Sequence, residues 1–210
     1  MNINQGAIIR GVVKVHTLKA GTAEKSWQVA DFLRDVERKA RLSTNQREVE
    51  KHERIAQELR KKLRNIFENG YIATPVECHN LITASSDRGM GTIIKQLAGS
   101  SAYTLEITHG EIGTSATTPT EADTALNAGV SRKEVTVVTE LSNKSVQFQF
   151  FWSDLELTND TYREFGIYAN GTTLTLGNGR MFNHALFSPV YNKSSSEDTT
   201  VEVQITLQND

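Results

Sequence analysis

The side chains best suited to chemistry in this sequence do not form an evident set. His109 and Glu111 stand two residues apart, so on an extended strand both would project from one face and could supply two ligands to a metal ion. A zinc site needs three or four protein ligands, and the sequence indicates no third ligand for this pair. We therefore interpret His109 and Glu111 as a surface pair and predict no metal site.

Cys78 and His79 are the second candidate pair. Neighbouring residues of an extended segment point to opposite sides, so the thiol and the imidazole would not face each other. A buried thiol beside an ordinary histidine is the simpler interpretation. Because the chain has one cysteine, an internal disulfide is excluded.

Asp154 and Glu156 are the residue types of a general acid and base. They alternate with Leu155 and Leu157, so we interpret them as solvent-facing residues of a strand. A hydrolase is the hypothesis that these two carboxylates leave open. Otherwise the sequence predicts no catalytic residue and no cofactor, and we expect a protein that is not an enzyme.

Two glycine-containing segments have the appearance of anion-binding loops. Gly89-Met90-Gly91-Thr92 lacks the Lys-Ser/Thr that completes a phosphate loop, so we interpret it as the start of a helix that runs to Leu97. Gly177-Asn178-Gly179-Arg180 has no nucleophile near it in the sequence and is interpreted as a hairpin loop.

Composition narrows the class of protein. The 210 residues carry 23 Lys and Arg against 25 Asp and Glu, and the isoelectric point of about 6.2 argues against a general nucleic-acid binder. The first residues, MNINQGAIIRG, lack the basic and apolar regions of a signal peptide, and no run of about 18 apolar residues occurs, so we expect no membrane partner. Ser, Thr and Asn make up 52 residues, which favours strands and turns with a polar surface.

A basic segment separates two parts of the chain. Residues 7–18 are rich in β-branched side chains and predict a strand. After this strand, 12 of the 23 basic residues fall between Gly21 and Gly70. In that segment apolar residues recur every three or four positions, which predicts two helices, the first capped by Ser26 and the second beginning near Thr44. Nine interleaved acidic residues favour a solvated helix surface over a nucleic-acid contact.

The second helix carries a narrow apolar stripe of the kind that packs against another helix. The stripe is too small to be buried alone, so it must pack on the β part or on another subunit. We predict it as an assembly interface, together with Phe151, whose side chain points away from its core-facing neighbours. The predicted interface residues are Val49, His52, Leu59, Leu63, Ile66 and Phe151.

After Gly70 the hydrophobic period falls to two. The large apolar residues of 146–152 alternate with Gln147 and Gln149, and apolar and polar residues alternate without error through 201–208. This is the pattern of antiparallel strands with one buried face. Asn170-Gly171, between expected strands at 166–168 and 173–176, predicts a two-residue hairpin turn. The fold class is therefore α+β and mainly β, an antiparallel β-sandwich with an inserted two-helix N-terminal arm. We expect three parts: the strand in 1–20, the arm in 21–70 and the sandwich in 71–210.

Four residues of the sandwich have predicted structural roles. Asp123 can cap a short helical turn. Arg132 and Glu164 lie at the ends of predicted strands, where they could form a bridging ion pair. Gly166, inside a strand, indicates a close backbone approach or a bulge.

Several short motifs follow one another in a fixed order after residue 78. They are HNLIT at 79–83, a short helix ending at Leu97-Ala98-Gly99, the segment 107–114, Thr117-Thr118-Pro119, DTAL at 123–126 with Arg132, REFGIY at 163–168, and the segment from Arg180 through Pro189 to Lys193. In this order they resemble a block common in structural proteins of tailed bacteriophages. The resemblance covers about residues 79 to 207 and departs from the block at Gly113-Thr114-Ser115-Ala116, where the usual second glycine is missing.

The resemblance implies a non-enzymatic virion protein, assembled in the host cytoplasm and present in several copies in the tail, baseplate or neck. Its expected partners are other virion proteins, including fibres, and copies of itself. A head fibre or capsid decoration protein is an alternative. Another is a carbohydrate-binding receptor domain that stacks sugars on Phe151, Tyr168 or Tyr191; a cell-surface glycan is otherwise expected to be only an indirect partner.

Overall fold

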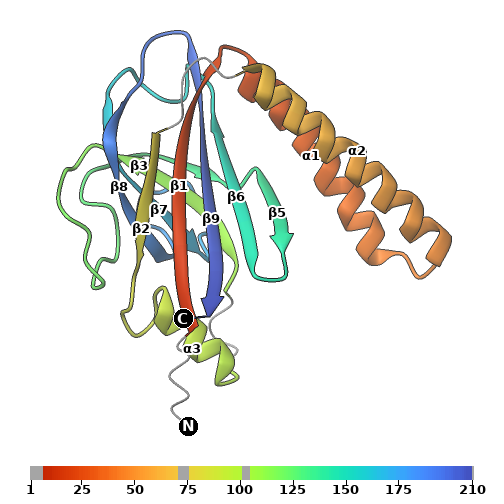
Figure 1. Cartoon of the computed structure of the whole chain (residues 1–210), viewed down its shortest axis with the longest axis horizontal. Helices are drawn as coiled ribbons and strands as arrows, with labels where there is room; N and C mark the ends of the chain where they lie inside the picture. Colours follow the sequence, from red (N-terminus) through yellow and green to blue (C-terminus); the bar gives the residue numbers. More distant parts are fainter. Residues whose placement is uncertain (1–6, 71–75, 101–104, 210) are drawn as a thin grey trace.

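The computed structural model describes residues 7–70, 76–100 and 105–209 (Figure 1). The helices are α1 (Thr22–Leu42), α2 (Gln46–Gly70) and α3 (Met90–Leu97). The strands are β1 (Ala7–Lys19), β2 (Val76–Ile82), β3 (Ile107–Gly113), β4 (Gly129–Glu134), β5 (Val137–Ser142), β6 (Ser145–Trp152), β7 (Thr161–Ala169), β8 (Arg180–Asn192) and β9 (Glu197–Asn209).

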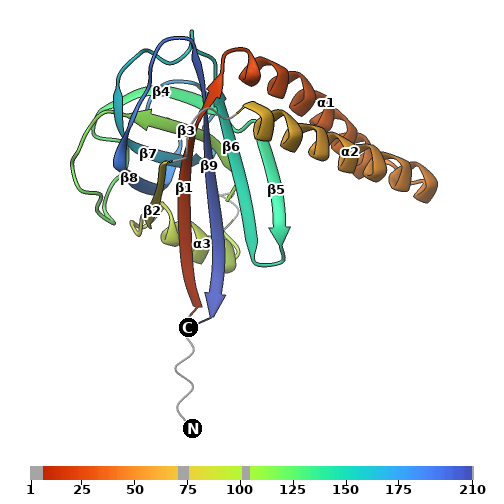
Figure 2. The ribbon, with the colours of Figure 1, turned by 45° about the horizontal axis from the view of Figure 1, so that its top comes forward.

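All nine strands belong to one hydrogen-bonded antiparallel sheet, in the order β4-β3-β7-β8-β2-β1-β9-β6-β5. The sheet curls until β3 and β7 face β6 (Figure 2), and the rings of Phe150 and Phe165 lie 5.6 Å apart between the layers. Gly110 permits this approach, because a Cβ there would lie 2.7 Å from Phe165 Cζ and 2.8 Å from Phe150 Cδ1. The predicted class, mainly β with antiparallel strands in two layers, is confirmed, and the two layers are halves of a single sheet.

The two edge strands of this sheet are consecutive in the chain. Between β4 and β5, the N–H of Val135 donates to Thr108 O in one layer, and the N–H of Thr136 donates to Gln149 O in the other, both at 2.8 Å. The chain thus crosses from layer to layer within two residues, a known way to make the corner of a sandwich.

The alternating segments form the core as predicted. Phe148, Phe150 and Trp152 of β6 and Val201, Val203 and Ile205 of β9 are buried between the layers. Their polar neighbours face outward, so the period of two in the sequence is the pleat of a sheet with one core face.

The predicted two-residue turn at Asn170-Gly171 is wrong. β7 and β8 do form a hairpin, but residues 170–179 connect them and 173–176 is not a strand. Asn178 Oδ1 accepts the N–H groups of Thr172 and Thr173, at 2.7 and 3.3 Å. These side-chain hydrogen bonds take the place of strand pairing. Gly177-Asn178-Gly179-Arg180 lies at the end of this loop, as the sequence predicts.

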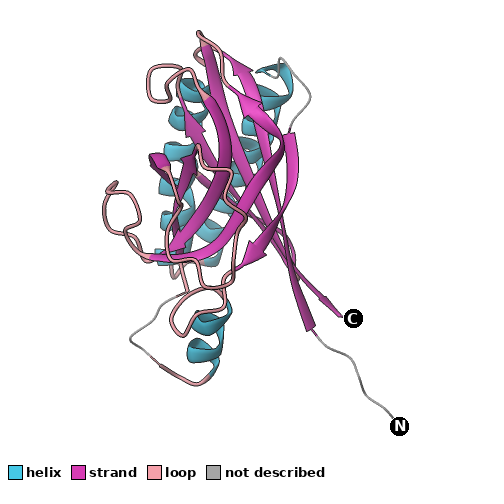
Figure 3. Ribbon diagram, turned by 90° about the vertical axis from the view of Figure 1, so that its left-hand side faces the viewer, coloured by secondary structure: helices cyan, strands magenta, loops and turns pink. Residues whose placement is uncertain are grey.

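Both helices of the arm are present, and the arm joins the body at the end of the sheet opposite to α3 (Figures 1 and 3). α1 begins at Thr22 rather than at Ser26, which lies inside the helix and donates to Thr22 O at 2.8 Å. α2 ends at Gly70 as predicted, and α3 begins inside the Gly89–Thr92 segment. In the described part of the chain, none of the helices combines the length and the apolar character that a membrane span requires.

Candidate functional site

The arm interrupts a pair of neighbouring strands. β1 and β2 pair up to Val15 and Val76, and the arm is inserted in the connection that follows. Its root is fixed to the sheet: Leu18, Leu33 and Phe151 belong to one buried cluster, and Lys133 Nζ of β4 lies 4.2 Å from the ring centroid of Trp27. The arm is therefore anchored at its base, while its far end extends away from the body (Figure 1).

Most of the predicted assembly interface packs inside the protein. Phe151 is fully buried beneath the arm, and Leu63 is buried in the same cluster, so the prediction that these two lie at a contact between subunits is wrong. Phe151 is buried because the arm covers the outer face of β6. The alternating pattern of the sequence predicts that this face is exposed to solvent. Leu59 and Ile66 also pack against this cluster, whereas Val49 and His52, nearer the tip, are partly exposed.

The strand β5 borders a continuous set of hollows. Val138 lines three of them, with volumes of about 580, 430 and 780 Å³, and Val137, Thr139 and Leu141 line a fourth of about 360 Å³. The hollows of 580, 360 and 430 Å³ lie between the arm and the sheet. Arg41 and Val138 line both the 580 and the 430 Å³ hollows, and Arg60 lines both the 360 and the 430 Å³ hollows. We call this space the arm groove.

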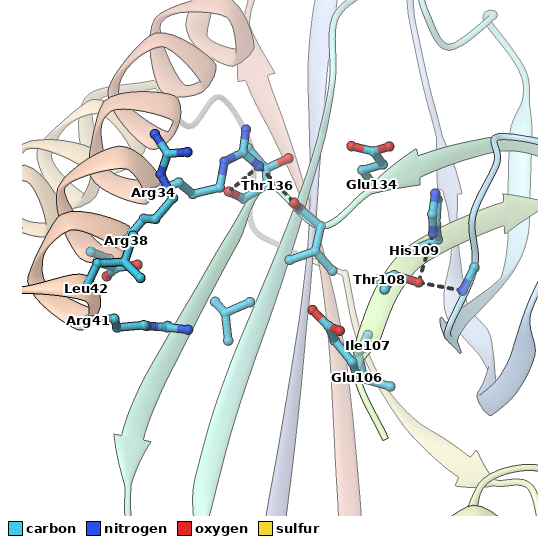
Figure 4. Close-up of a pocket in the computed structure, with 14 residues that line it drawn as sticks. Arg34, Arg38, Arg41, Leu42, Glu106, Ile107, Thr108, His109, Glu134 and Thr136 are labelled. Atoms are coloured by element: carbon cyan, nitrogen blue, oxygen red, sulfur yellow. Dashed lines mark hydrogen bonds between the residues drawn. The ribbon is translucent and has the colours of Figure 1, made fainter. Parts of the chain in front are cut away.

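In the hollow of 580 Å³ the arm wall, which also includes Glu37, is basic on balance and the sheet wall is acidic. Arg34, Arg38 and Arg41 stand on the arm side, and Glu106 and Glu134 on the sheet side (Figure 4). Arg34 and Arg38 are paired with Asp31 and Asp35, and Arg34 Nη1 also donates to Val135 O at 3.2 Å. Arg41 has no ion-pair partner among the residues that the structure describes, so it is available to a ligand.

His109 closes one end of the groove and is buried. The N–H of Gly171 donates to Thr108 Oγ1 at 2.8 Å, and that hydroxyl lies 3.0 Å from His109 Nδ1 (Figure 4). Burial and the nearby Arg132 lower the pKa of His109, which favours the neutral ring. Within the described residues Nε2 has no hydrogen-bond partner.

The interpretation of His109 and Glu111 as a surface pair is wrong. Both are buried, and Glu111 forms an ion pair with Arg132 of β4, with Oε2 3.1 Å from Nη1. Glu111 Oε2 also accepts the N–H of Gly177 at 2.8 Å, while Arg132 donates to Thr173 O and to Asn178 O and lies over the Tyr168 ring. Burial raises the pKa of Glu111, against the opposing effect of Gly177 and Arg132. This pair fixes the 170–179 loop to the sheet.

A second buried network holds the 114–128 loop. His184 lies between two carboxylates, with Nδ1 2.6 Å from Asp123 Oδ2 and Nε2 3.0 Å from Glu164 Oε2. Glu164 also accepts the N–H groups of Asn127 and Ala128, at 3.2 and 2.7 Å. His184 and Glu164 are fully buried, and the network fixes the 114–128 loop to β7 and β8.

Three of the four predicted structural residues take part in these networks, with other partners than expected. Arg132 pairs with Glu111, and Glu164 pairs with His184, so the predicted Arg132–Glu164 bridge is wrong. Asp123 accepts the N–H of Thr120 at 2.9 Å, at a tight turn. Gly166 is a close approach, as predicted: a Cβ there would lie 3.0 Å from Asn183 O.

The remaining candidates do not form a reactive site. Cys78 is buried, which raises the pKa of its thiol to about 12. Asp154 and Glu156 lie in a turn rather than on a strand, and Glu156 Oε2 accepts the N–H of Ser153 at 2.9 Å. Among the residues that the structure describes, no three His, Cys, Asp or Glu side chains are grouped so that they could hold a metal ion.

The aromatic residues proposed to stack sugars are not available for it. Phe151, Tyr168 and Tyr191 are all buried. Tyr168 Oη accepts the N–H of Leu126 at 3.1 Å, and Tyr191 Oη lies 2.8 Å from Thr199 Oγ1. The receptor hypothesis therefore loses the residues on which it was based.

Comparison of the chain with protein-family models, with curated proteins and with solved structures finds no match in any of the three.

Proposed function

We propose that this chain is a non-enzymatic structural protein of a bacteriophage virion, present in several copies in the tail, baseplate or neck, where it connects neighbouring proteins or fibres. The observation that carries the proposal is the arm. A helical hairpin inserted between two central strands, anchored at its root and extending beyond the body, is suited to reaching a neighbouring molecule.

The motifs that resemble the phage block are consistent with a scaffold. Asp123, Arg132 and Glu164 come from those motifs, and each takes part in a buried network that fixes a loop to the sheet. Residues with this role support a stable frame on which the variable part, here the arm, can be carried. The proposal therefore assigns assembly to the arm and stability to the block.

A direct test is to look for the protein in particles. Virions from a lysate of the host that carries this gene would be purified, and antibodies raised against the chain would be used for immunogold labelling. We expect labelling at a fixed place on the particle and a constant number of copies. A protein that stays in the soluble fraction of the lysate would overturn the proposal.

The role of the arm can be tested with a shortened arm. Buried residues of α1 end at Val36 and those of α2 begin at Ala56, so a short Gly-rich turn can replace residues 38–53 without opening the root. We expect this variant to fold and to be absent from particles. Leu155→Asp is the control, because Leu155 is 92% exposed on a loop of the sheet; it should be incorporated normally. Normal incorporation of the short-arm variant would argue against an assembly role for the arm.

A further inference from the structure

The free edge of β5 is only weakly protected against pairing with another strand: Glu140 is its one charged residue, and its register against β6 shifts between Glu140 and Ser142. β5 ends the sheet order and, in the described part of the chain, pairs only with β6. Its sequence, VVTELS, has no proline and no lysine, and Val138 and Leu141 are 46% and 48% exposed. Edge strands that remain unpaired are usually protected by charge, proline or bulges. The segment 137–139 carries none of these, so this part of the edge is suited to receive another strand.

The arm extends past this edge. At 1.5 Å per residue, the 21 residues of α1 and 25 of α2 span about 32 and about 38 Å. Only the root packs on the sheet, and beyond it the arm groove separates the helices from Val138, Thr139 and Glu140 of β5. Figure 2 shows β5 as the outermost strand beside the arm. A strand added to β5 would therefore have a helical wall beside it.

We propose that a second copy of this chain occupies this place, through antiparallel pairing of β5 with β5 about a two-fold axis at Thr139. A two-fold interface must be complementary to itself, and β5 has this property. Pairing centred on Thr139 puts Val137 opposite Leu141 of the second copy, which joins two apolar residues on the face toward α2.

The other face of the pair is complementary in charge. The same alignment puts Glu140 of the second copy opposite Val138, and Val138 and Arg41 line the same three hollows. Glu140 of the same copy lines two of these hollows, so Arg41 would lie near a carboxylate from each copy. Neither Arg41 nor Glu140 has an ion-pair partner among the described residues. The incoming carboxylate therefore meets a free guanidinium, and by symmetry this contact forms twice.

This inference deepens the proposed function, on which the biological role of the dimer rests. Its test uses the purified protein and does not require virions. Sedimentation velocity of the purified full chain between about 1 and about 100 μM is expected to show a monomer–dimer equilibrium. Glu140→Arg places a guanidinium against Arg41 and is expected to weaken the dimer at least about tenfold. The charge swap Arg41→Glu with Glu140→Arg is expected to restore it. Glu121→Arg, an exposed carboxylate on the 114–128 loop, is the control and should dimerise normally.

A wild-type chain that remains a monomer at the highest concentration would overturn the inference, as would a Glu140→Arg dimer of unchanged stability. Failure of the charge swap to restore the dimer would overturn the contact between Arg41 and Glu140. Dimerisation of a protein that is absent from virions would contradict the proposed function and leave the β5 interface standing, whereas a monomeric protein found in virions would do the reverse.

Discussion

Glu164 Oε2 lies 3.0 Å from Nε2 of His184, and neither side chain is exposed to solvent. Burial alone would raise the pKa of Glu164, but hydrogen bonds from His184, Ala128 and Asn127 outweigh it and lower that pKa. Burial alone would lower the pKa of His184, but the carboxylates of Glu164 and Asp123 outweigh it and raise that pKa. The two groups thus stabilise each other's charged forms.

The pH dependence of stability follows from these directions. The contribution of Glu164 is complete above its ordinary pKa of 4.5 and is lost as the pH falls through its lowered pKa. The contribution of His184 is complete below its ordinary pKa of 6.5 and is lost as the pH rises through its raised pKa. Denaturant unfolding of wild type and His184→Gln should therefore differ most between pH 4.5 and 6.5. A difference that does not vary with pH would show that the imidazole is uncharged.

The ion pair of Glu111 and Arg132 should behave as a unit. Arg132→Met leaves the Glu111 carboxylate buried without its cation, and we expect a loss of about 3 to 5 kcal/mol in the free energy of unfolding. Replacing both, as Arg132→Met with Glu111→Leu, removes the unpaired charge and should cost clearly less than the single change. A double-mutant cycle from urea unfolding measures this coupling, and simple additivity of the two single losses would contradict it.

Phe151 tests whether the arm and the sheet share one core. Phe151→Ala removes a fully buried ring between β6 and the arm, so we expect a loss of about 3 to 5 kcal/mol. Phe32→Ala is a matched control, because Phe32 is 53% exposed on α1, and its loss should be far smaller. Equal losses in the two variants would mean that the arm is not packed on β6 in solution.

The sequence predicted the helices and strands correctly where a single hydrophobic period determined the element. Strict alternation located β6 and β9, and helical spacing located α1 and α2. Phe151 was misplaced because β6 is covered on both faces, so an outward position is also buried. Asn170-Gly171 was misjudged because Arg132 and Glu111 bind the backbone of the following loop, which outweighs the local turn preference.

The candidate sites depend on partners that sequence spacing does not reveal. Arg132 and Glu164 were correctly singled out, but Glu111 and His184 reach them from neighbouring strands of the sheet. Strand order decides these pairings, and the order here follows only from the curl of the whole sheet. The free edge of β5 was likewise missed, because nothing in VVTELS indicates that the strand lies at the end of the sheet.

Asp198 links the arm to the sheet and gives the last prediction. α1 has Gly21 at its N-cap position, without a side-chain hydrogen bond. Asp198 of β9 supplies the acceptor instead, since its Oδ2 accepts the N–H of Ala23 at 2.7 Å. Its other oxygen, Oδ1, accepts the N–H of Asp154 at 3.0 Å. Asp198→Ala leaves the buried N–H of Ala23 and the partly buried N–H of Asp154 without this acceptor, so we expect a loss of about 1 to 3 kcal/mol. Asp198→Asn keeps one carbonyl oxygen and should lose less. Hydrogen exchange would locate the effect. The amide of Ala23 should exchange faster in both variants. The amides of β7 should exchange no faster than the change in global stability requires. Unchanged exchange at Ala23 in Asp198→Ala would contradict the assignment of Asp198 as the cap of α1.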